Sequence, residues 1–367
     1  MVGRELEYIR AAVESGHLAG NGMFTAQCHH FFEQHFGFSR VLLTHSATAA
    51  LEMAALLLDI QPGDEVILPS YTHVSTANAF ALRGARLVFV DSMPDHPNMD
   101  TSGIELLITD KTRVIVVVHY GGYPVDMGSV LDMSIRHRLY IVEDAAPAIG
   151  ARYHGIPLGS IGHLAAFSFH ETKNLQCGEG GMLVINDERF MQRAEVIWEK
   201  GTDRMAMFRG DVQQYGWKDL GSSFLPSELT AAYLWAQIEQ FRAIQHHRRQ
   251  LWENYAERLV SGMQKGWFQL LPTSSVGDHN WHVMALICHD RDERSRLISY
   301  LAERGIMAVS HYRSLHKSAY YHLRHDGRDL PNSDRFEDCL IRLPLFHDLQ
   351  LEQVKAITHS LSAFYGG

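Results

Sequence analysis

The chain has 367 residues, of which 46% are hydrophobic and 20% charged, and its formal net charge is −9. This composition is typical of a globular protein with a large core, and the length suits a large domain joined to a smaller one. The acidic balance argues against broad nucleic-acid binding, which needs a basic surface. A membrane span is not expected either, because no run of about 18 uncharged apolar residues occurs.

Histidine and cysteine patterns do not predict a metal site. The adjacent pairs His29-His30 and His246-His247 lack the i, i+4 spacing of a helical metal site. No CxxC pair occurs, so neither a zinc site nor a disulfide framework is expected from the four cysteines, Cys28, Cys177, Cys288 and Cys339. Scattered thiols suit a reducing compartment, and residues 1–6 lack the apolar segment of a secretory signal. We therefore expect a cytoplasmic protein.

The first half of the chain alternates apolar runs with helical patterns. The runs are residues 40–43, 65–68, 86–90, 114–118, 139–142, 165–168 and 182–185. Runs that are apolar on both faces indicate strands buried on both sides, and intervening helices indicate a mainly parallel α/β sheet. Ligands of such sheets bind beyond the carboxyl ends of the strands.

The second half predicts more helix. A long loop over residues 200–222 carries four glycines, and a long helix is predicted to start near residues 226–228 and to continue past residue 250. Beyond residue 265, a strand over 281–287 and helices over 292–304 and 351–364 indicate a compact α+β unit. We therefore expect a large α/β domain of residues 1–240 and a small C-terminal domain of residues 241–367.

Small polar residues follow the first predicted strand and precede an alanine-rich helix. The N-terminus of that helix offers unpaired N–H groups and partial positive charge, so it can hold a phosphate with help from the hydroxyls of Ser46 and Thr48. An ordinary Ser/Thr helix cap is the alternative explanation.

Asp144 lies just beyond another apolar run. A carboxylate held there needs a cationic partner, because burying it unpaired is costly. A protonated pyridine nitrogen is one such partner, and its charge makes the ring a better electron sink. A structural aspartate that caps the next helix is the alternative.

Lys173 follows a third strand and precedes the glycine-rich turn of residues 178–181. Desolvation would lower its pKa and favour the neutral amine, which can form a Schiff base with a cofactor aldehyde. Ser168, five residues earlier, could reach the same phosphate, and the glycines would let backbone pass close to a bound ring. A phosphate cup, an acid and a lysine in this order predict a pyridoxal phosphate (PLP) site.

These motifs resemble the DegT/DnrJ-type sugar aminotransferases, which share the fold-type I architecture of aspartate aminotransferase. The resemblance runs nearly end to end, and the pair formed by residues 167–174 and residues 178–181 is specific for the family. Further matching segments are residues 56–67, 69–72, 75–80, 219–223 and 343–346. The resemblance implies a mainly parallel seven-stranded sheet domain and a small α+β domain.

The resemblance also implies roles for individual residues. Lys173 would carry PLP, Asp144 would pair with the pyridine nitrogen, and Thr48, Ala49 and Ser168 would hold the phosphate. Ser223 would add a phosphate contact from the other subunit of a homodimer, in which the active sites are shared.

Three departures from the family pattern stand out. Pro147 occupies the position of a glutamine that bonds the ring oxygen of the cofactor, and proline cannot make that bond. His73 occupies the position of an aromatic residue that stacks on the ring. A short segment that usually precedes residues 3–6 is missing.

The implied reaction is the transfer of an amino group from L-glutamate to C4 of a dTDP-4-keto-6-deoxyhexose. The resemblance favours the galactose epimer, for surface polysaccharide. Lys200, Arg204 and Arg209 are candidates for binding the nucleotide-sugar diphosphate, with solvated surface charge as the alternative. His311 and Tyr312 resemble family residues near the sugar.

Other functions stay open at this point. Formation of the glucose epimer or transfer to C3 is not excluded by the sequence. A dehydratase relative would have histidine in place of Lys173, which argues against that activity. A sensor that binds PLP without turnover gains some support from Pro147.

Overall fold

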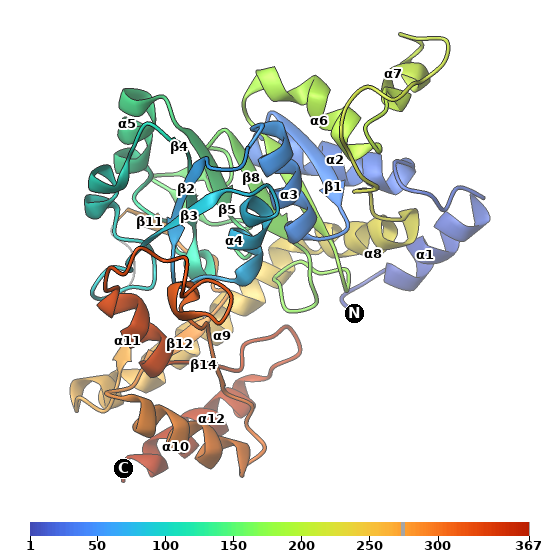
Figure 1. Ribbon diagram of the computed structural model, residues 1–367. Coiled ribbons are helices and arrows are strands. Elements are labelled where there is room, and N and C mark those ends of the chain that lie inside the picture. Colours follow the sequence, from blue (N-terminus) through green and yellow to red (C-terminus); the bar gives the residue numbers. More distant parts are fainter. Residues whose placement is uncertain (273–275, 367) are drawn as a thin grey trace.

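A seven-stranded sheet forms the centre of the large domain in the computed structural model, which describes residues 1–272 and 276–366 (Figure 1). Its strand order is β1-β9-β8-β5-β4-β2-β3. The strands are β1 (Arg40–Thr44), β2 (Glu65–Pro69), β3 (Arg86–Val90), β4 (Thr112–Val118), β5 (Tyr140–Asp144), β8 (Leu164–Ser168) and β9 (Gly181–Ile185). Each of the seven apolar runs is a strand, so the predicted sheet is confirmed.

The sheet is parallel apart from one strand. Pairs β2–β3, β2–β4, β4–β5 and β5–β8 are parallel, whereas β9 is antiparallel to both of its neighbours, β8 and β1. The parallel strands are largely apolar on both faces, as expected where helices cover both sides of a sheet. This arrangement confirms the predicted α/β fold class.

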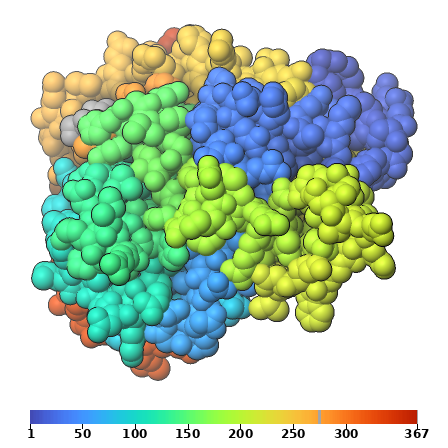
Figure 2. Space-filling model, turned by 90° about the horizontal axis from the view of Figure 1, so that it is seen from above, coloured from blue at the N-terminus to red at the C-terminus, as the bar shows by residue number. Residues whose placement is uncertain are grey.

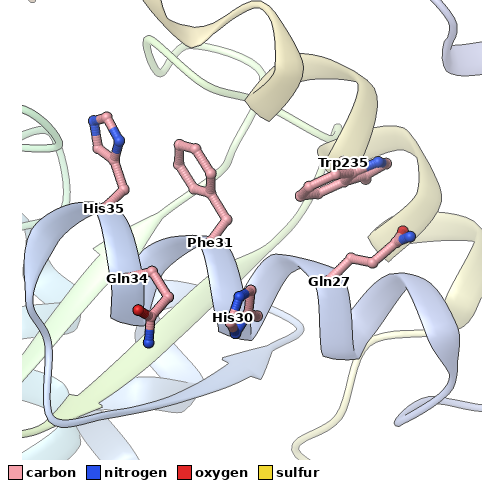
Figure 3. A pocket seen from close by; sticks show the side chains of 6 residues that line it. All are labelled: Gln27, His30, Phe31, Gln34, His35 and Trp235. Carbon is pink, nitrogen blue, oxygen red and sulfur yellow. The ribbon is translucent and has the colours of Figure 1, made fainter.

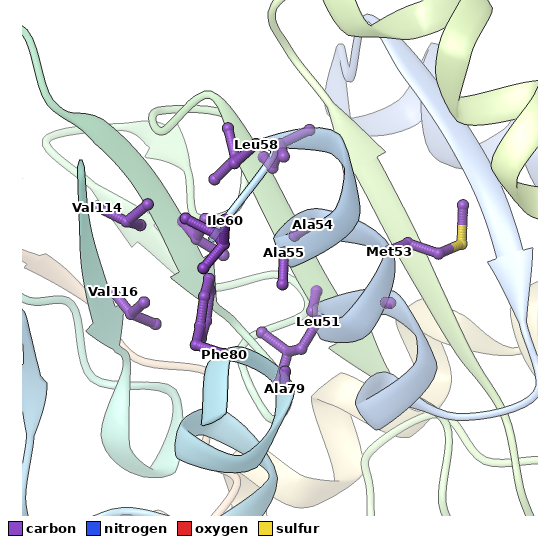
Figure 4. Packing of buried hydrophobic residues seen from close by; sticks show 14 of the residues in the cluster. Leu51, Met53, Ala54, Ala55, Leu58, Ile60, Ala79, Phe80, Val114 and Val116 are labelled. Carbon is purple, nitrogen blue, oxygen red and sulfur yellow. The ribbon is translucent and has the colours of Figure 1, made fainter. Parts of the chain in front are cut away.

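One face of the sheet is covered by α3 (Ala47–Leu57), α4 (Val74–Ala81) and α6 (Met191–Trp198). Figure 4 shows α3 and α4 meeting the strand residues Val114 and Val116 through small and apolar side chains such as Ala55 and Phe80. Five alanines in α3 keep this helix close to the strands. The close packing fixes the start of α3 at the carboxyl end of β1.

The opposite face is covered by α2 (Met23–Phe36), α5 (Met127–His137) and α8 (Glu228–Glu239). Helix α1 (Glu5–Glu14) packs on α8 at the edge of the domain (Figure 1). Short 3₁₀ turns link the main elements: η1 (Thr101–Gly103), η2 (Glu105–Leu107), η3 (Tyr120–Gly122), η4 (Glu188–Phe190) and η5 (Leu315–Lys317).

The small domain has its own sheet and core. Its antiparallel strands have the order β10-β12-β14-β13, with bounds Gln269–Leu270, Met284–Ile287, Leu340–Leu343 and Val309–Ser310. One face packs against α9 (Phe241–Gln264), α10 (Arg291–Ala302) and α12 (Leu351–Phe364). Helix α11 (Pro331–Cys339) leads into β14, and a three-stranded ribbon joins β11 (Gly277–Asp278), β6 (Arg152–Tyr153) and β7 (Ile156–Pro157).

Two predictions for the region after residue 186 need correction. The long helix predicted from residue 226 past 250 is wrong, because α8 ends at Glu239 and α9 begins at Phe241. Gln240 separates them with φ −97° and ψ 9°. The loop of residues 200–222 contains a short helix, α7 (Arg204–Arg209), which ends at Gly210 with φ 84°. This segment stands out from the large domain on the side away from the small domain (Figures 1 and 2).

Within the described residues, no helix is both long and apolar enough to cross a bilayer. The four cysteines are all free.

Candidate active site

Three neighbouring strands bring the predicted phosphate residues together. The register pairs Thr44 of β1 with Gly181 of β9, and Gly181 with Ser168 of β8. Helix α3 starts directly after Thr44, so its N-terminus lies at the same edge of the sheet as Ser168. We call the set Thr44, Ser46, Thr48, Ala49, Ser168 and Gly181 the cup.

The two hydroxyls predicted to help hold phosphate already have partners in the protein. The hydroxyl of Ser46 caps α3 by accepting the N–H of Ala49 at 3.1 Å, and Thr48 donates to the hydroxyl of Ser75 at 2.8 Å. The first intrahelical bond is donated by Ala50 to Ser46, so the earlier N–H groups of the first turn point out of the helix end. The cup can therefore hold an anion chiefly through backbone N–H groups and the helix dipole.

Gly181 allows α3 to sit this close to the sheet. A Cβ atom at this position would lie 2.4 Å from the carbonyl carbon of Ser46 and 2.5 Å from the nitrogen of Ala47. The sequence suggested that the glycine-rich turn makes room for a bound ring, but at Gly181 the observed neighbour is the start of α3. The glycine thus sets the geometry of the cup itself.

Asp144 ends β5 and is buried, with 5% of its surface exposed. Its Oδ2 accepts the hydroxyl of Thr76 at 2.6 Å, and its Oδ1 accepts the N–H of Ala146 at 3.1 Å. Each carboxylate oxygen retains a lone pair beyond these two bonds. The group is therefore a fixed buried anion that can still accept a hydrogen bond from a protonated ring nitrogen.

Lys173 lies in the turn after β8 and is partly buried. Burial lowers the pKa of its amine to about 8, helped by the positive charge of Arg342 and opposed by Asp144. A larger share of the amine is therefore neutral near pH 7 than for an exposed lysine, which suits a nucleophile that attacks an aldehyde. The interaction with Asp144 also shows that the predicted acid and lysine face one site.

The residue after the lysine anchors this turn to the small domain. Asn174 is buried, and its amide donates to Gln245 of α9 and to the carbonyl of Asn280, both at 2.9 Å. Its Oδ1 lies 2.9 Å from Nδ1 of His282. Burial holds the pKa of His282 well below its usual range. His282 is therefore neutral and donates this bond, and Lys173 is held between the two domains.

His73 caps helix α4, and its Nδ1 accepts the N–H of Ser75 at 3.2 Å. Burial lowers the pKa of the imidazole, with Asp144 raising it and Lys173 lowering it. The effects of Asp144 and Lys173 on its pKa place His73 beside these two residues, where a ring-stacking residue is predicted to lie. The other departure, Pro147, has its carbonyl bonded to the amide of Asn280 at 2.6 Å.

The predicted sugar-binding residues His311 and Tyr312 also come to this site. The ring of Tyr312 lies 5.9 Å from that of His73, and burial raises the pKa of its phenol. Burial and the charges of Arg342 and Lys173 lower the pKa of His311 to about 3. Nη1 of Arg342 lies 2.9 Å from Nε2 of this neutral ring.

Sequence reasoning missed Arg342 and Thr76. Arg342 interrupts the apolar strand Leu340–Leu343 just before a matched family segment, and this charge inside an apolar run was the available signal. Thr76 lies within a matched segment, but no pattern indicates that its hydroxyl reaches a residue 68 positions away.

The loop residues predicted to bind diphosphate do not reach Lys173 in the same chain. Lys200 lies 3.1 Å from Glu199, and Arg209 lies 2.7 Å from Glu195. Arg204 is 4.0 Å from Glu199. All three belong to the segment around α7, on the side of the large domain away from the small domain (Figure 1).

Ser223 is exposed and directly precedes Phe224, whose carbonyl accepts the N–H of His45 at 3.0 Å. It therefore lies near the cup of its own chain. Its predicted contact across a subunit boundary stays a prediction.

A separate hollow lies on the surface formed by α2 and α8 (Figure 3). Its walls are Gln27, His30, Phe31, Gln34, His35 and Trp235. None of these residues belongs to the cup or to the surroundings of Lys173, so the hollow is distinct from the site described above.

The fold and the site together define a class of protein. A mainly parallel sheet carries an anion cup at a helix N-terminus, a buried aspartate with spare acceptor capacity and a partly neutral lysine, and these groups fit the phosphate, ring nitrogen and aldehyde of PLP. This is the arrangement of a fold-type I PLP enzyme. Comparison with known proteins makes the assignment more specific.

The chain belongs to the DegT/DnrJ/EryC1/StrS aminotransferase family, whose model matches residues 1–362. It is 29% identical over 369 aligned residues to GDP-perosamine synthase of Escherichia coli O157:H7, covering 100% of this chain and 96% of that protein. The crystal structure of DesV from S. venezuelae is 30% identical with a TM-score of 0.89, over 98% of this chain and 94% of that one.

Spr1654 of Streptococcus pneumoniae, solved in its PMP form, is 25% identical with a TM-score of 0.90, over 98% of this chain and 96% of that one. The predicted family, cofactor and enzyme class are thereby confirmed. The protein is a PLP-dependent sugar aminotransferase.

Proposed function

We propose that the enzyme transfers the amino group of L-glutamate to C4 of a dTDP-4-keto-6-deoxyhexose, forming the galactose epimer of the 4-amino-4,6-dideoxy sugar for surface polysaccharide. The observation that carries the proposal is that Asp144 acts electrostatically on Lys173 at one site, where burial lowers the pKa of the lysine to about 8. Motif resemblance along the whole chain supports the 4-keto substrate. The Escherichia coli relative is named for a GDP-sugar, so a GDP-linked substrate is the competing assignment.

Each group at the site has a separate task. PLP supplies an electron sink that stabilises negative charge at the carbon next to the transferred nitrogen. Asp144 would accept a hydrogen bond from the ring nitrogen and favour its protonated form, and the cup would hold the phosphate. Lys173 would hold the cofactor and move one proton in each half of the reaction, a task that suits an amine with a pKa of about 8.

We further propose a cytoplasmic homodimer with shared active sites. The segment around α7 presents exposed apolar side chains, including Trp217 with 81% and Phe208 with 58% of their surfaces exposed. Exposed apolar groups gathered on a protruding segment are typical of interaction surfaces. A second copy covering this segment would bring Lys200, Arg204 and Arg209 to a neighbouring site, where they could meet the diphosphate.

The test follows the visible absorbance of purified holoprotein. Adding L-glutamate should remove the absorbance of the lysine-bound cofactor, and subsequent addition of dTDP-4-keto-6-deoxyglucose should restore it. NMR of the product should show nitrogen at C4 with galactose stereochemistry. An amino group at C3, or the glucose epimer, would contradict the substrate assignment, and no response to glutamate would favour a PLP-binding sensor.

Lys173→Ala should abolish both half-reactions, because it removes the partly neutral amine that is assigned to carry the cofactor. Borohydride treatment of wild type should leave a reduced adduct on Lys173, detected by mass spectrometry. Turnover in the variant would refute the assigned role.

A further inference from the structure

Asn280 lies in the connection between β11 and β12, and it is fully buried. Its amide Nδ2 donates to the carbonyl of Pro147 at 2.6 Å and to the carbonyl of Ile149 at 2.9 Å. Both acceptors belong to the loop that follows Asp144 at the end of β5. One side chain thus satisfies two backbone carbonyls in the loop that begins at the buried acid.

The same residue also holds the lysine turn and the loop after β4. Its backbone carbonyl accepts the amide of Asn174, the neighbour of Lys173, at 2.9 Å. Its Oδ1 occupies the space that a side chain at position 122 would need, because a Cβ atom at Gly122 would lie 2.0 Å from this oxygen. Strands β8, β5 and β4 are neighbours in the sheet. Asn280 therefore sits where the loops from the carboxyl ends of these three strands meet.

A second set of contacts fixes the chain next to Asn280. Arg248 of α9 is 3% exposed, and it donates to the carbonyls of Trp281 and His282 at 3.3 and 2.8 Å. The ring of His282 in turn donates to Asn174 at 2.9 Å. Trp281 has a φ of 55°, which residues other than glycine adopt rarely and only where their surroundings enforce it. The conformation of this connection is therefore imposed by α9 and the lysine turn together.

The sheet alone does not set the distance between Lys173 and Asp144. Strands β5 and β8 are paired as far as Asp144 and Ala166, and Lys173 lies farther along the chain, in the turn after β8. The position of its amine therefore depends on the contacts that hold this turn. A reacting group that is displaced by about 1 Å can lose about 100-fold in rate, so these contacts matter for the reaction.

We infer that Asn280 is a positioning residue for amino transfer: it ties the lysine turn to the loop after Asp144 and so sets the place of Lys173 relative to that acid. This inference rests on the roles proposed for Lys173 and Asp144. Asn280 acts through Asn174 on one side and through the backbone of Pro147 and Ile149 on the other. An amide suits this task because its NH₂ group offers two donors, one for each carbonyl.

The experiment compares wild type with Asn280→Asp and Asn280→Ser. Asn280→Asp keeps the shape of the side chain but directs an oxygen at the two carbonyls, whereas Asn280→Ser keeps one donor and leaves space. Asn332→Asp is the matched control, because Nδ2 of Asn332 donates to the carbonyl of Ser92 at 2.9 Å and ties α11 to the chain after β3, away from the residues assigned to the site. Cofactor absorbance and urea unfolding give the loading and the stability of each holoprotein.

Stopped-flow absorbance gives the maximal rate of the glutamate half-reaction and the half-saturating glutamate concentration, and a pH titration gives the midpoint of the absorbance of the lysine-bound cofactor. Asn280→Asp should lower the maximal rate about 10- to 100-fold and leave the half-saturating concentration within about threefold of wild type. Its pH midpoint should move by more than about 0.5 pH unit, because the surroundings of the lysine nitrogen change. Asn280→Ser should give intermediate values, and Asn332→Asp should match wild type in all three quantities.

A purely structural role would lower stability or cofactor loading and leave the maximal rate per bound cofactor and the pH midpoint unchanged. That result in an Asn280 variant would overturn the inference, and so would an equal loss of rate in Asn332→Asp. Should Asn280→Asp fail to fold or to bind PLP, the Asn280→Ser values decide. A wild type that does not respond to glutamate would instead contradict the proposed donor, and the pH midpoints would still test Asn280.

Discussion

Thr76 donates its hydroxyl proton to Oδ2 of Asp144 over 2.6 Å, although the two residues are 68 positions apart. Because that proton is committed, the hydroxyl of Thr72, 3.0 Å from Oγ1 of Thr76, acts as donor to Thr76. All three side chains are buried. A short chain of hydroxyls thus ends on one oxygen of this buried carboxylate and fixes its position.

Thr76→Val should weaken PLP binding about tenfold or more, since it removes one hydrogen bond to a buried charged group without changing the volume much. Thr76→Ser keeps the hydroxyl and should bind PLP within about threefold of wild type. Fluorescence titration of apoprotein with PLP measures both constants. Equal affinities for the two variants would show that the hydroxyl contributes nothing to the cofactor site.

The strands and the two central residues could be predicted because their signals are local. Runs that are apolar on both faces occur where helices cover both sides of the sheet, and Asp144 and Lys173 each follow such a run. The polar residues at strand ends were therefore recognisable without knowledge of the packing.

Arg342 and Thr76 could not be assigned in this way. The charge of Arg342 acts on Lys173 because the small-domain sheet packs against the large domain, and no local pattern encodes that packing. The break between α8 and α9 was missed because a single residue, Gln240, leaves the helical conformation within an otherwise continuous helical pattern.

The titration of Lys173 should be visible in the stability of the apoprotein. Its pKa is about 8 in the folded chain and 10.5 in the unfolded chain. Between these values the unfolded state binds more protons, so the contribution of Lys173 to the free energy of unfolding rises with pH. The shift corresponds to about 3 kcal/mol, and about 1–3 kcal/mol is expected because the side chain is only partly buried.

Other groups titrate in the same window, so Lys173→Met provides the reference. Urea unfolding of both apoproteins at pH values of about 7.5, 8.5, 9.5 and 10.5 gives the difference between their free energies of unfolding at each pH. The free energy of unfolding of wild type should increase relative to that of the variant as the pH rises. A constant difference would mean that the amine titrates alike in both states.

Gly181→Ala should loosen the cup. The new Cβ would lie 2.4 Å from backbone of Ser46, and backbone at a helix start can retreat only by moving α3. Overpacking of this kind costs about 1–3 kcal/mol, and PLP affinity should fall about 10- to 100-fold because the phosphate-binding N–H groups move. Gly103→Ala, with nothing within 4 Å of its Cβ, is the control and should bind PLP normally. Normal affinity in Gly181→Ala would show that the cup tolerates displacement of α3.

Glu228 joins the N-termini of two helices and should be important for stability. It begins α8 with 2% of its surface exposed, and its carboxylate accepts N–H groups from Gly22 at 2.9 Å, Phe24 at 2.8 Å and Thr25 at 3.2 Å. These are the orphan donors at the start of α2, whose own cap residue is a glycine with no side chain to offer.

Glu228→Ala should lower the free energy of unfolding by about 2–4 kcal/mol, because several buried donors lose a charged acceptor together. The exposed Glu253, which pairs with Arg249 across one helical turn, provides the contrast, and Glu253→Ala should cost less than about 0.5 kcal/mol. Urea unfolding curves of the holoproteins measure both. If the two substitutions cost the same, water must satisfy the start of α2 as well as Glu228 does.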